Sequence, residues 1–383
     1  MASGCRRLGA FLSEIEDVLA VLRVLDTTAA PRGREFAAAQ ALCELCRSHW
    51  PRIAWQVQRV GAHGANLVAS HGPGPLLYSH LDTSVDGDAG QLRVTFDSVE
   101  GFGLAVARGP AAAALVAFAT ATSGTLLLAS SGTHRRGAEA AGVDAWLAAN
   151  SQPRSAIVAK CGPPGVLWSE PGALYLTVSV TGRAGAVMTP ASAVPAGGLP
   201  ARLGVVLDVL ASWCSDYVAG RPGVGQLGAA AGIGAVDAGL PDKADLFPAS
   251  ARIGLYVVTL PGSSTASLVA EVSARVRAVL VGDLAGCTVD VTADPVHDAA
   301  ATPPDAAIVT AAIAAWTASF GAPAEVTGWT GSTDGVLLRA RGIDTVRLGP
   351  QPTLAPDDPR REVLRIDQLA AFVAIYRELL STR

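Results

Sequence analysis

Charged side chains are scarce in this chain of 383 residues, where aspartate, glutamate, lysine and arginine together make up 16%. Half of the residues are hydrophobic, so the sequence can bury a large core and does not resemble a disordered protein. The formal net charge is −4 and the isoelectric point is near 5.9, which does not suit a protein with a general basic surface for nucleic acid. We therefore expect a folded protein of about two domains that does not bind nucleic acid.

Cysteine is also sparse, and its six residues are too scattered for a disulfide-stabilised scaffold. Cys43 and Cys46 have the spacing of a metal or redox pair, but they lie in an alanine- and leucine-rich helical pattern without a second pair. We interpret them as core residues, with metal or redox use as the alternative.

No charged residue occurs from Gly109 to Thr133, a stretch long enough to imitate a membrane span. Small and hydroxylated residues dominate it, however, and Ser123 and Gly124 divide it. A buried helix at about 111–121 followed by a buried strand at 125–130 explains the pattern better.

The first residues do not have the pattern of a secretory signal, because Glu14, Glu16 and Asp17 interrupt their apolar residues. We therefore expect a cytoplasmic protein without a membrane partner.

The apolar periodicity predicts an α/β domain. Amphipathic helices are expected at 8–25 and 34–49, and short apolar strands near 65–69, 75–80, 125–130 and 155–159. Strands of this kind that alternate with helical patterns are typical of a largely parallel sheet. The alternation of helices and apolar strands returns near the C-terminus, where helices are expected at 304–319 and 366–381 and a strand at 343–348.

The pattern changes between these two parts. Residues 173–180 alternate between apolar and polar, as in a half-exposed strand, and further strands are expected near 231–237, 251–259 and 287–292. Helices at about 200–218 and 264–280 would cover one face of this mainly antiparallel sheet. We therefore predict an α/β catalytic-type domain of residues 1–172 and 296–383, with an inserted α+β domain of residues 173–295.

The strongest chemical signal is the stretch from Leu76 to Asp82, where an apolar strand ends in His80 and Asp82 follows two residues later. An imidazole and a carboxylate at a strand end can ligate a metal or work as an acid–base dyad. We expect Asp82 to accept the ring N–H of His80 and so to fix its orientation.

This strand end, with Ser79–Thr83, resembles that of the zinc aminoacylase, acetylornithine deacetylase, succinyl-diaminopimelate desuccinylase and glutamate carboxypeptidase family. Other stretches resemble further segments of the family in the same order, over nearly the whole chain: 101–110, 233–241, 256–262, 328–335 and 342–350. The resemblance implies a metallo-exopeptidase-like α/β catalytic domain with a mainly parallel central sheet, and an inserted α+β lid domain. It also implies a homodimer formed through the lid, where Leu203, Val206, Leu207 and Leu210 have helical spacing and Trp213 follows.

The resemblance further implies two zinc ions, yet most of the family's ligand positions carry other residues here. The bridging aspartate falls on Val106, the glutamate base and its neighbour near 133–135, an acidic ligand on Lys160, and the closing histidine on or near Asp358. A hydrolytic zinc needs about three protein ligands, and lysine and arginine repel the cation. We therefore expect no metal and no other cofactor, with a zinc held by rewired ligands as the alternative.

Charged residues in the implied cleft suggest a remodelled site, because a basic cluster beside carboxylates is typical of binding to a small anionic molecule. The predicted catalytic residues are His80, Asp82, His134 and Asp334, and the predicted substrate-binding residues are Arg108, Arg135, Lys160 and Asp358. The alternatives are a solvated turn near 133–136, a structural ion pair for Arg108, and capping of a helix at 335–341 by Asp334.

Two residues are predicted as possible nucleophiles. Cys161 follows Lys160, and a neighbouring cation lowers the pKa of a thiol. Thr333 is a hydroxyl alternative, as is Ser332, and each needs a base such as His80 or His134.

These residues together favour an enzyme that hydrolyses an amide or related acyl bond in a small anionic, amino-acid-like compound, without the two zinc ions and in specialised metabolism. The alternatives are a metal-dependent deacylase or peptidase with rewired ligands, and a non-catalytic binding or scaffold protein on the same fold.

Overall fold

The computed structural model describes residues 2–28, 33–83, 91–130, 141–188, 198–358 and 360–381. The chain forms two compact units. Unit 1 comprises Met1–Ser169, Ala301–Val326 and Thr333–Arg383, and unit 2 comprises Glu170–Ala300 and Thr327–Ser332. Two short strands, β8 (Ser169–Glu170) and β15 (Ala300–Ala301), lie where the chain passes from one unit to the other.

Unit 1 contains a six-stranded sheet with the strand order β1-β2-β6-β3-β7-β16. The strands are β1 (Gln56–Val60), β2 (Gly64–Ser70), β3 (Leu76–His80), β6 (Thr125–Ala129), β7 (Ser155–Ala159) and β16 (Asp344–Leu348). The last four of these pair in parallel, and β1 and β2 pair antiparallel along one side. The predicted α/β class with a mainly parallel sheet is therefore confirmed. Its strands are continuous apolar runs because helices cover both faces.

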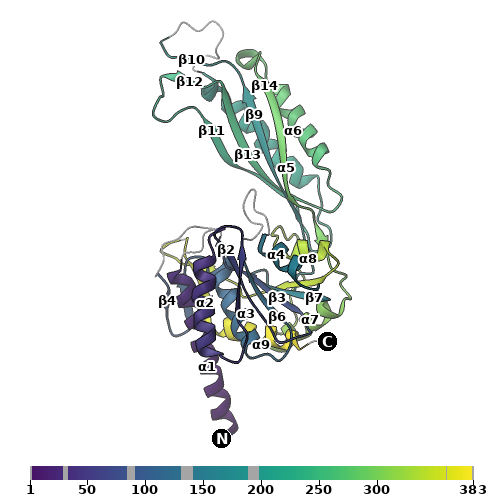
Figure 1. Ribbon diagram of the computed structural model, residues 1–383. Coiled ribbons are helices and arrows are strands. Elements are labelled where there is room, and N and C mark those ends of the chain that lie inside the picture. The colour runs from purple at the N-terminus through teal and green to yellow at the C-terminus, as the bar shows by residue number, and fades with distance from the viewer. Residues whose placement is uncertain are drawn as a thin grey trace. The chain divides into compact units, whose positions relative to one another are not determined.

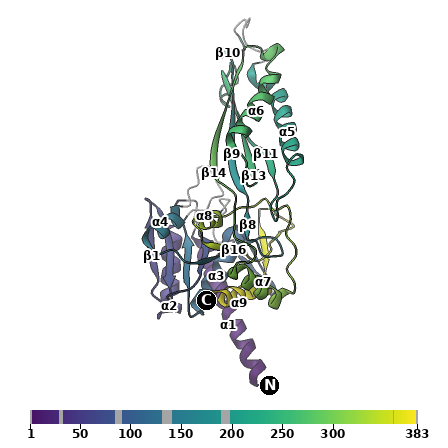
Figure 2. The same ribbon diagram turned by 90° about the vertical axis from the view of Figure 1, so that its right-hand side faces the viewer.

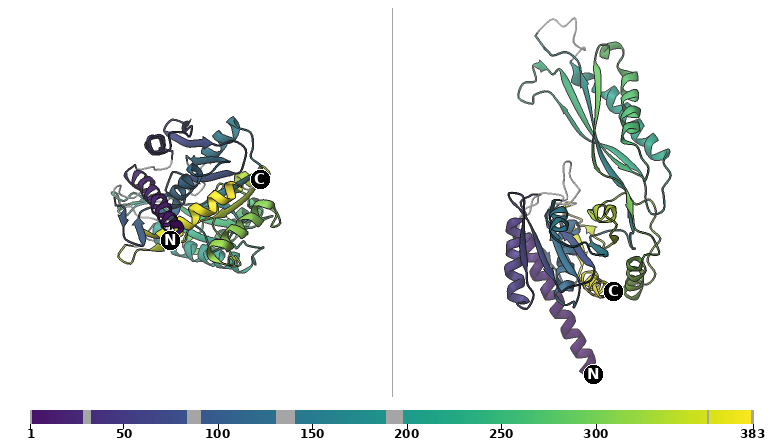
Figure 3. Two further views of the ribbon diagram at one scale, coloured as in Figure 1. Left: turned by 90° about the horizontal axis from the view of Figure 1, so that it is seen from below. Right: turned by 45° about the vertical axis from the view of Figure 1, so that its right-hand side comes forward.

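One face of this sheet carries α1 (Ala2–Thr27), α2 (Phe36–His49), α3 (Gly109–Ala119), α7 (Ala307–Phe320) and α9 (Ile366–Leu380), and the other carries α4 (Ala141–Ala149) and α8 (Gly335–Ala340). Alternate residues of β3 enter the two layers, since Leu77 packs with the first set of helices and Tyr78 with the second. The left view of Figure 3, seen from below, shows the yellow C-terminal helix α9 in the first layer, where it contacts α3.

The described part of the charge-free stretch lies in the core of unit 1, as its composition predicted. Every described residue of α3 from Gly109 to Phe118 is buried, and β6 follows as a buried strand. No helix in the described part of the chain is long and apolar enough to cross a membrane. Cys43 and Cys46 are also buried in this core, and burial raises the pKa of both thiols, which confirms their interpretation as packing residues.

A second sheet of unit 1 was not predicted. It has the order β17-β18-β5-β4, built from β4 (Arg93–Val94), β5 (Ser98–Gly101), β17 (Thr353–Leu354) and β18 (Glu362–Arg365). A π-helical turn, η1 (Leu104–Arg108), links β5 to α3. These strands are too short to show an alternating pattern in the sequence.

Unit 2 is an antiparallel sheet with the order β11-β13-β9-β14, and α5 and α6 cover one of its faces (Figure 2). Its main elements are β9 (Gly172–Thr181), α5 (Leu203–Ala219), β11 (Ala230–Ala238), β13 (Ser250–Thr259), α6 (Thr265–Val279) and β14 (Thr288–His297). Its shorter elements are β10 (Gly185–Ala186), η2 (Leu199–Arg202), β12 (Leu246–Phe247) and η3 (Gly282–Leu284).

The face of α5 on which the dimer prediction rests packs inside unit 2. Leu203, Val206, Leu210 and Trp213 are buried in a core shared with α6 and the sheet, and Leu207 packs against that core. These side chains are therefore not available to a second copy of the chain. A homodimer stays a prediction, and it would have to use side chains other than these.

Candidate active site in unit 1

The candidate site lies at one edge of the six-stranded sheet. β3 is flanked by β6 and β7, and all three run in parallel, so their carboxyl ends meet at this edge. His80 pairs with Ala129, the residue before Ser130, and Tyr78 pairs with Val158, which places His80 level with Lys160. In open parallel sheets, ligands bind outside the carboxyl ends of the strands. The register therefore brings His80, Ser130 and Lys160 together at the edge where such folds hold a ligand.

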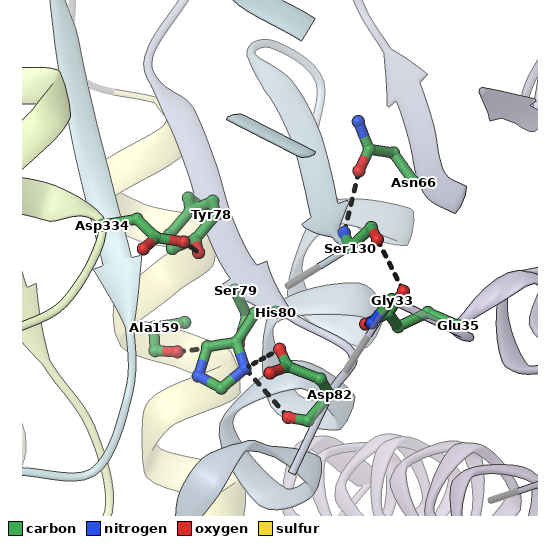
Figure 4. A network of polar contacts seen from close by, with 10 residues as sticks. All are labelled: Gly33, Glu35, Asn66, Tyr78, Ser79, His80, Asp82, Ser130, Ala159 and Asp334. Atoms are coloured by element: carbon green, nitrogen blue, oxygen red, sulfur yellow. Dashed lines mark hydrogen bonds and ion pairs between the residues drawn. The ribbon is translucent and has the colours of Figure 1, made fainter. Parts of the chain in front are cut away.

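His80 is held by Asp82, as the sequence predicted. The ring Nδ1 lies 2.9 Å from the carboxylate Oδ1 and 2.9 Å from the backbone oxygen of Asp82, and both residues are buried. Both oxygens only accept hydrogen bonds, so Nδ1 carries the proton. In the neutral ring, Nε2 then has the lone pair and the character of a base. Figure 4 shows the ring and the two contacts at the end of β3.

A second polar pair, Tyr78 and Asp334, lies beside this one in Figure 4. The Tyr78 hydroxyl donates to Oδ2 of Asp334, and both residues are buried. Asp334 stands at the N-cap of α8 but makes no capping hydrogen bond with its side chain, so the capping role considered for it is wrong. Instead, Oγ1 of Thr333, one of the predicted nucleophiles, accepts a hydrogen bond from the Gly335 N–H at 3.0 Å.

The sequence reasoning missed Tyr78, although a signal for it existed. Tyr78 and His80 are two residues apart on one strand, so their side chains leave the sheet on the same face. A buried phenol hydroxyl on the same face as a candidate base needs a hydrogen-bond acceptor, and a carboxylate such as Asp334 can supply it.

A buried carboxylate on the other side of β3 was also missed. Oε2 of Glu35 accepts a hydrogen bond from the Ser130 hydroxyl at 2.5 Å, and its Oε1 accepts from the Gly33 N–H at 2.6 Å. Asn66 accepts from the Ser130 N–H at 2.8 Å, which fixes the end of β6. Glu35 precedes α2 without any recognisable motif, so only the fold brings it to the strand end (Figure 4).

Arg108 and Lys160, two of the predicted substrate-binding residues, are both buried. Arg108 forms an ion pair with Asp26 at 3.1 Å and donates to the Phe102 carbonyl at 2.9 Å, and burial lowers its pKa. These contacts fit the alternative of a structural ion pair. Lys160 follows β7 directly, and continuing the register of Tyr78 with Val158 puts it level with His80.

The thiol of Cys161 does not have the predicted lowered pKa. Burial is the largest influence and raises its pKa well above the ordinary value, and the nearby charges of Arg347 and Lys160 only partly oppose this. Because the thiolate is the reactive form, burial disfavours Cys161 as a nucleophile. Its backbone oxygen accepts a hydrogen bond from Arg347 at 2.5 Å, which is a structural contact.

The remaining predicted residues lie elsewhere or are not described. Asp358 pairs with Arg360, its neighbour in the loop before β18, and this hydrogen bonding lowers the pKa of the carboxyl to about 2. His134 and Arg135 lie outside the described residues. Their predicted roles, and those of the other site residues, stay predictions.

Among the described residues, no set of ligands for a two-zinc centre surrounds His80. Within the described ranges, no group of three or more histidine, cysteine, aspartate or glutamate side chains is placed to hold a metal ion. At the position where the resemblance expects the bridging aspartate, Val106 presents an apolar side chain from η1. The Glu362 carboxylate accepts a hydrogen bond at Oε2 from the Ala105 N–H at 2.7 Å, which ties β18 to this turn.

A broad hollow of about 1250 Å³ lies at the opposite edge of the sheet. Its lining includes Pro75, Thr125 and Ser155, at the amino ends of β3, β6 and β7, and none of the predicted site residues. His80 and its polar neighbours therefore lie at one edge of the sheet, and the hollow lies at the opposite edge.

Comparison with solved structures identifies the fold. Human carnosine dipeptidase 1 matches with a TM-score of 0.72 at 12% sequence identity, over 97% of this chain and 98% of that chain. The di-peptidase Dug1p from Saccharomyces cerevisiae matches with a TM-score of 0.69 at 12% identity, over 98% and 99% of the two chains. An M20 family metallo-carboxypeptidase from Sulfolobus solfataricus matches with a TM-score of 0.64 at 13% identity, over 96% and 99%.

In sequence, the chain matches no family model and no curated protein. The structural likeness is therefore a likeness of fold: the chain has the architecture of M20 peptidases over nearly its full length.

Proposed function

We propose that this protein hydrolyses an amide bond in a small anionic, amino-acid-like compound, with His80 as the general base. One observation carries the proposal: His80, at the carboxyl end of the central strand, has its Nδ1 proton fixed by two oxygens of Asp82. A base oriented by a carboxylate is the arrangement that general-base catalysis needs. The fold shared with dipeptidases supports an amide as the bond that is cleaved.

The reaction follows from this geometry. Nε2 of His80 takes a proton from a water molecule as the water oxygen attacks the carbonyl carbon of the substrate. The C–N bond then breaks, and the leaving amine takes the proton from His80. Asp82 stabilises the imidazolium between these steps, and the ammonium of Lys160 stabilises negative charge on the substrate.

Activity is tested on a panel of dipeptides and of N-acetyl and N-succinyl amino acids, by release of the free amine. We expect hydrolysis of at least one acidic member, and a loss of at least about 10³-fold in His80→Ala. His80→Gln, which fills the same space, keeps the test valid if the alanine variant does not fold. His63→Ala is the matched control, because His63 is exposed on the turn between β1 and β2.

Metal analysis separates this proposal from its nearest rival, a metal-dependent deacylase or peptidase with rewired ligands. The donor set around His80 predicts less than about one equivalent of zinc in the purified protein, and activity that survives a chelator. Stoichiometric zinc whose removal abolishes hydrolysis would overturn the proposal in favour of the rival. Tight binding of panel members without any turnover would favour the non-catalytic binding protein.

A further inference from the structure

Unit 2 contains a histidine and a serine that form a hydrogen-bonded pair. Nε2 of His297 lies 3.0 Å from the hydroxyl oxygen of Ser332. His297 ends β14, immediately after a register shift between Pro295 and His297 in the pairing with β9. Such bulges redirect side chains and are common near active sites. Both side chains are part-buried rather than fully buried.

The proton positions in this pair follow from its neighbours. Nδ1 of His297 lies 3.2 Å from the backbone oxygen of Asp298, which can only accept a hydrogen bond, so Nδ1 carries the proton. Nε2 of the neutral ring therefore accepts the hydroxyl proton of Ser332. Burial lowers the pKa of His297, against the opposing charges of Glu170 and Asp298, so the ring is neutral near pH 7.

A third side chain completes the arrangement. The Tyr256 hydroxyl, from β13, hydrogen-bonds the Ser332 side chain, and burial raises the pKa of Tyr256, so the phenol stays protonated. The ring of Tyr175 packs edge-to-face on Tyr256, with centroids 5.0 Å apart, and so positions it. Nδ1 of His297 donates to the carbonyl of Asp298, which leaves Nε2 to accept the hydroxyl proton of Ser332.

We propose that Ser332 is a nucleophile activated by His297, and that the pair accepts an acyl group from a small ester, thioester or activated amide. A nucleophile hydrogen-bonded to a base, with the base oriented by a third group, is the general arrangement of covalent hydrolases. The site uses none of the His80 residues, so it goes beyond the function proposed above.

The chemistry balances without any cofactor. His297 takes the proton of Ser332 as the serine oxygen attacks the carbonyl carbon, and Tyr256 donates to the oxyanion that forms. The bond to the leaving group breaks, and the leaving group takes the proton from His297. Water then attacks the acyl-serine, His297 takes a proton from it and returns that proton to Ser332, and a carboxylic acid is released.

An alkyl fluorophosphonate tests the pair on the full-length protein, because an activated serine displaces its fluoride and becomes phosphonylated. We expect one adduct by intact mass, located on Ser332 by peptide mass spectrometry and absent from Ser332→Ala. His297→Gln should slow labelling by at least about 10²-fold, and Tyr256→Phe by about 10²-fold. Ser263→Ala, an exposed serine of unit 2, should label at the wild-type rate.

Two outcomes would overturn the proposal: wild-type labelling no faster than that of Ser332→Ala, or a rate that His297→Gln leaves unchanged. If a variant fails to fold, the pH dependence of the labelling rate in the wild-type protein tests the proposal instead. The labelling rate should rise with pH through a pKa below about 6.5, because only the neutral ring accepts the proton. His80→Ala should label normally, so that failure here and failure of the amide hydrolase proposal are distinguished.

Discussion

The two candidate sites each contain a histidine whose Nδ1 proton is fixed by an oxygen acceptor, but the acceptors differ in charge. In unit 1, a buried carboxylate and a carbonyl of Asp82 hold His80. In unit 2, a backbone carbonyl of Asp298 holds the more accessible His297. A carboxylate stabilises the imidazolium ion that forms when the ring takes a proton, whereas a carbonyl supplies only a dipole. The carboxylate therefore allows His80 to keep the proton between two steps of the reaction. His297 lacks this stabilisation and should transfer its proton to the leaving group at once.

The two candidate sites also offer different groups to stabilise negative charge. Lys160 is a buried cation level with His80, whereas Tyr256 beside Ser332 is a neutral donor. A cation attracts a substrate that already carries a negative charge. A neutral phenol instead donates a hydrogen bond to an oxyanion that forms only during the reaction. The first site should therefore select acidic compounds, and the second should tolerate neutral acyl groups.

The largest expected effect concerns the carboxylate of Asp82. Asp82→Asn keeps the shape of the side chain, but its amide can donate to the ring and favour the wrong tautomer of His80. We expect kcat for amide hydrolysis to fall by about 10⁴-fold, the magnitude known for such a change in a catalytic triad. Labelling of Ser332 by the fluorophosphonate should not change. A fall of less than 10-fold would show that the carboxylate of Asp82 is not part of the mechanism.

The next effect concerns the charge at position 160. Lys160→Met removes the ammonium and keeps an unbranched chain, so kcat/KM for an acidic substrate should fall by about 10²-fold, mainly through KM. A neutral substrate should lose less. Lys243→Met is the matched control, since Lys243 pairs with Asp245 on the surface of unit 2. Equal losses for acidic and neutral substrates would contradict a charge-recognition role.

A smaller effect concerns stability, measured by urea unfolding. Asp334→Ala leaves the buried Tyr78 hydroxyl without its acceptor and should lower the free energy of unfolding by about 1–3 kcal/mol. The exposed pair of Asp237 and Arg252 offers a control, because Asp237→Ala should cost less than about 1 kcal/mol. Combining Asp334→Ala with Tyr78→Phe should destabilise less than the sum of the two, which a double-mutant cycle would measure.

The smallest effect is a pH dependence in unit 2. Burial lowers the pKa of His297 below 6.5, its ordinary value in the unfolded chain. Below pH 6.5 the unfolded chain therefore binds more protons at this residue than the folded chain, and stability falls as the pH drops towards the folded-state pKa. His297→Gln should reduce this loss when unfolding is compared at pH 7.5 and pH 5.5. An identical loss of stability in both proteins would show that a residue other than His297 titrates.

Local features of both units could be predicted from the sequence because they depend on neighbouring residues. The apolar run before His80 predicted β3, and the spacing of His80 and Asp82 predicted their hydrogen bond. The alternation at 173–180 predicted the half-exposed strand that became β9.

Contacts between distant residues could not be predicted in this way. Tyr78 and Asp334 are 256 residues apart, and Arg108 and Asp26 are 82 apart, so only the folded topology brings them together. The sequence offers Ser332 as a nucleophile with His80 or His134 as its base, because nothing in the sequence signals the bulge beside His297 or its contact with Ser332. Burial also reversed the pKa expected for Cys161, since a sequence shows the charge next to a thiol but not its depth.

The position of β3 inside the sheet has a consequence for how the protein would lose activity. All five residues of β3 are buried, and the strand is hydrogen-bonded to a neighbour on each side. Amide hydrogens in such a strand exchange with solvent only when the whole surrounding structure opens. We therefore expect His80 to leave its place only when the sheet around it opens. On heating, amide hydrolysis should therefore persist up to the cooperative melting of unit 1 and disappear with it.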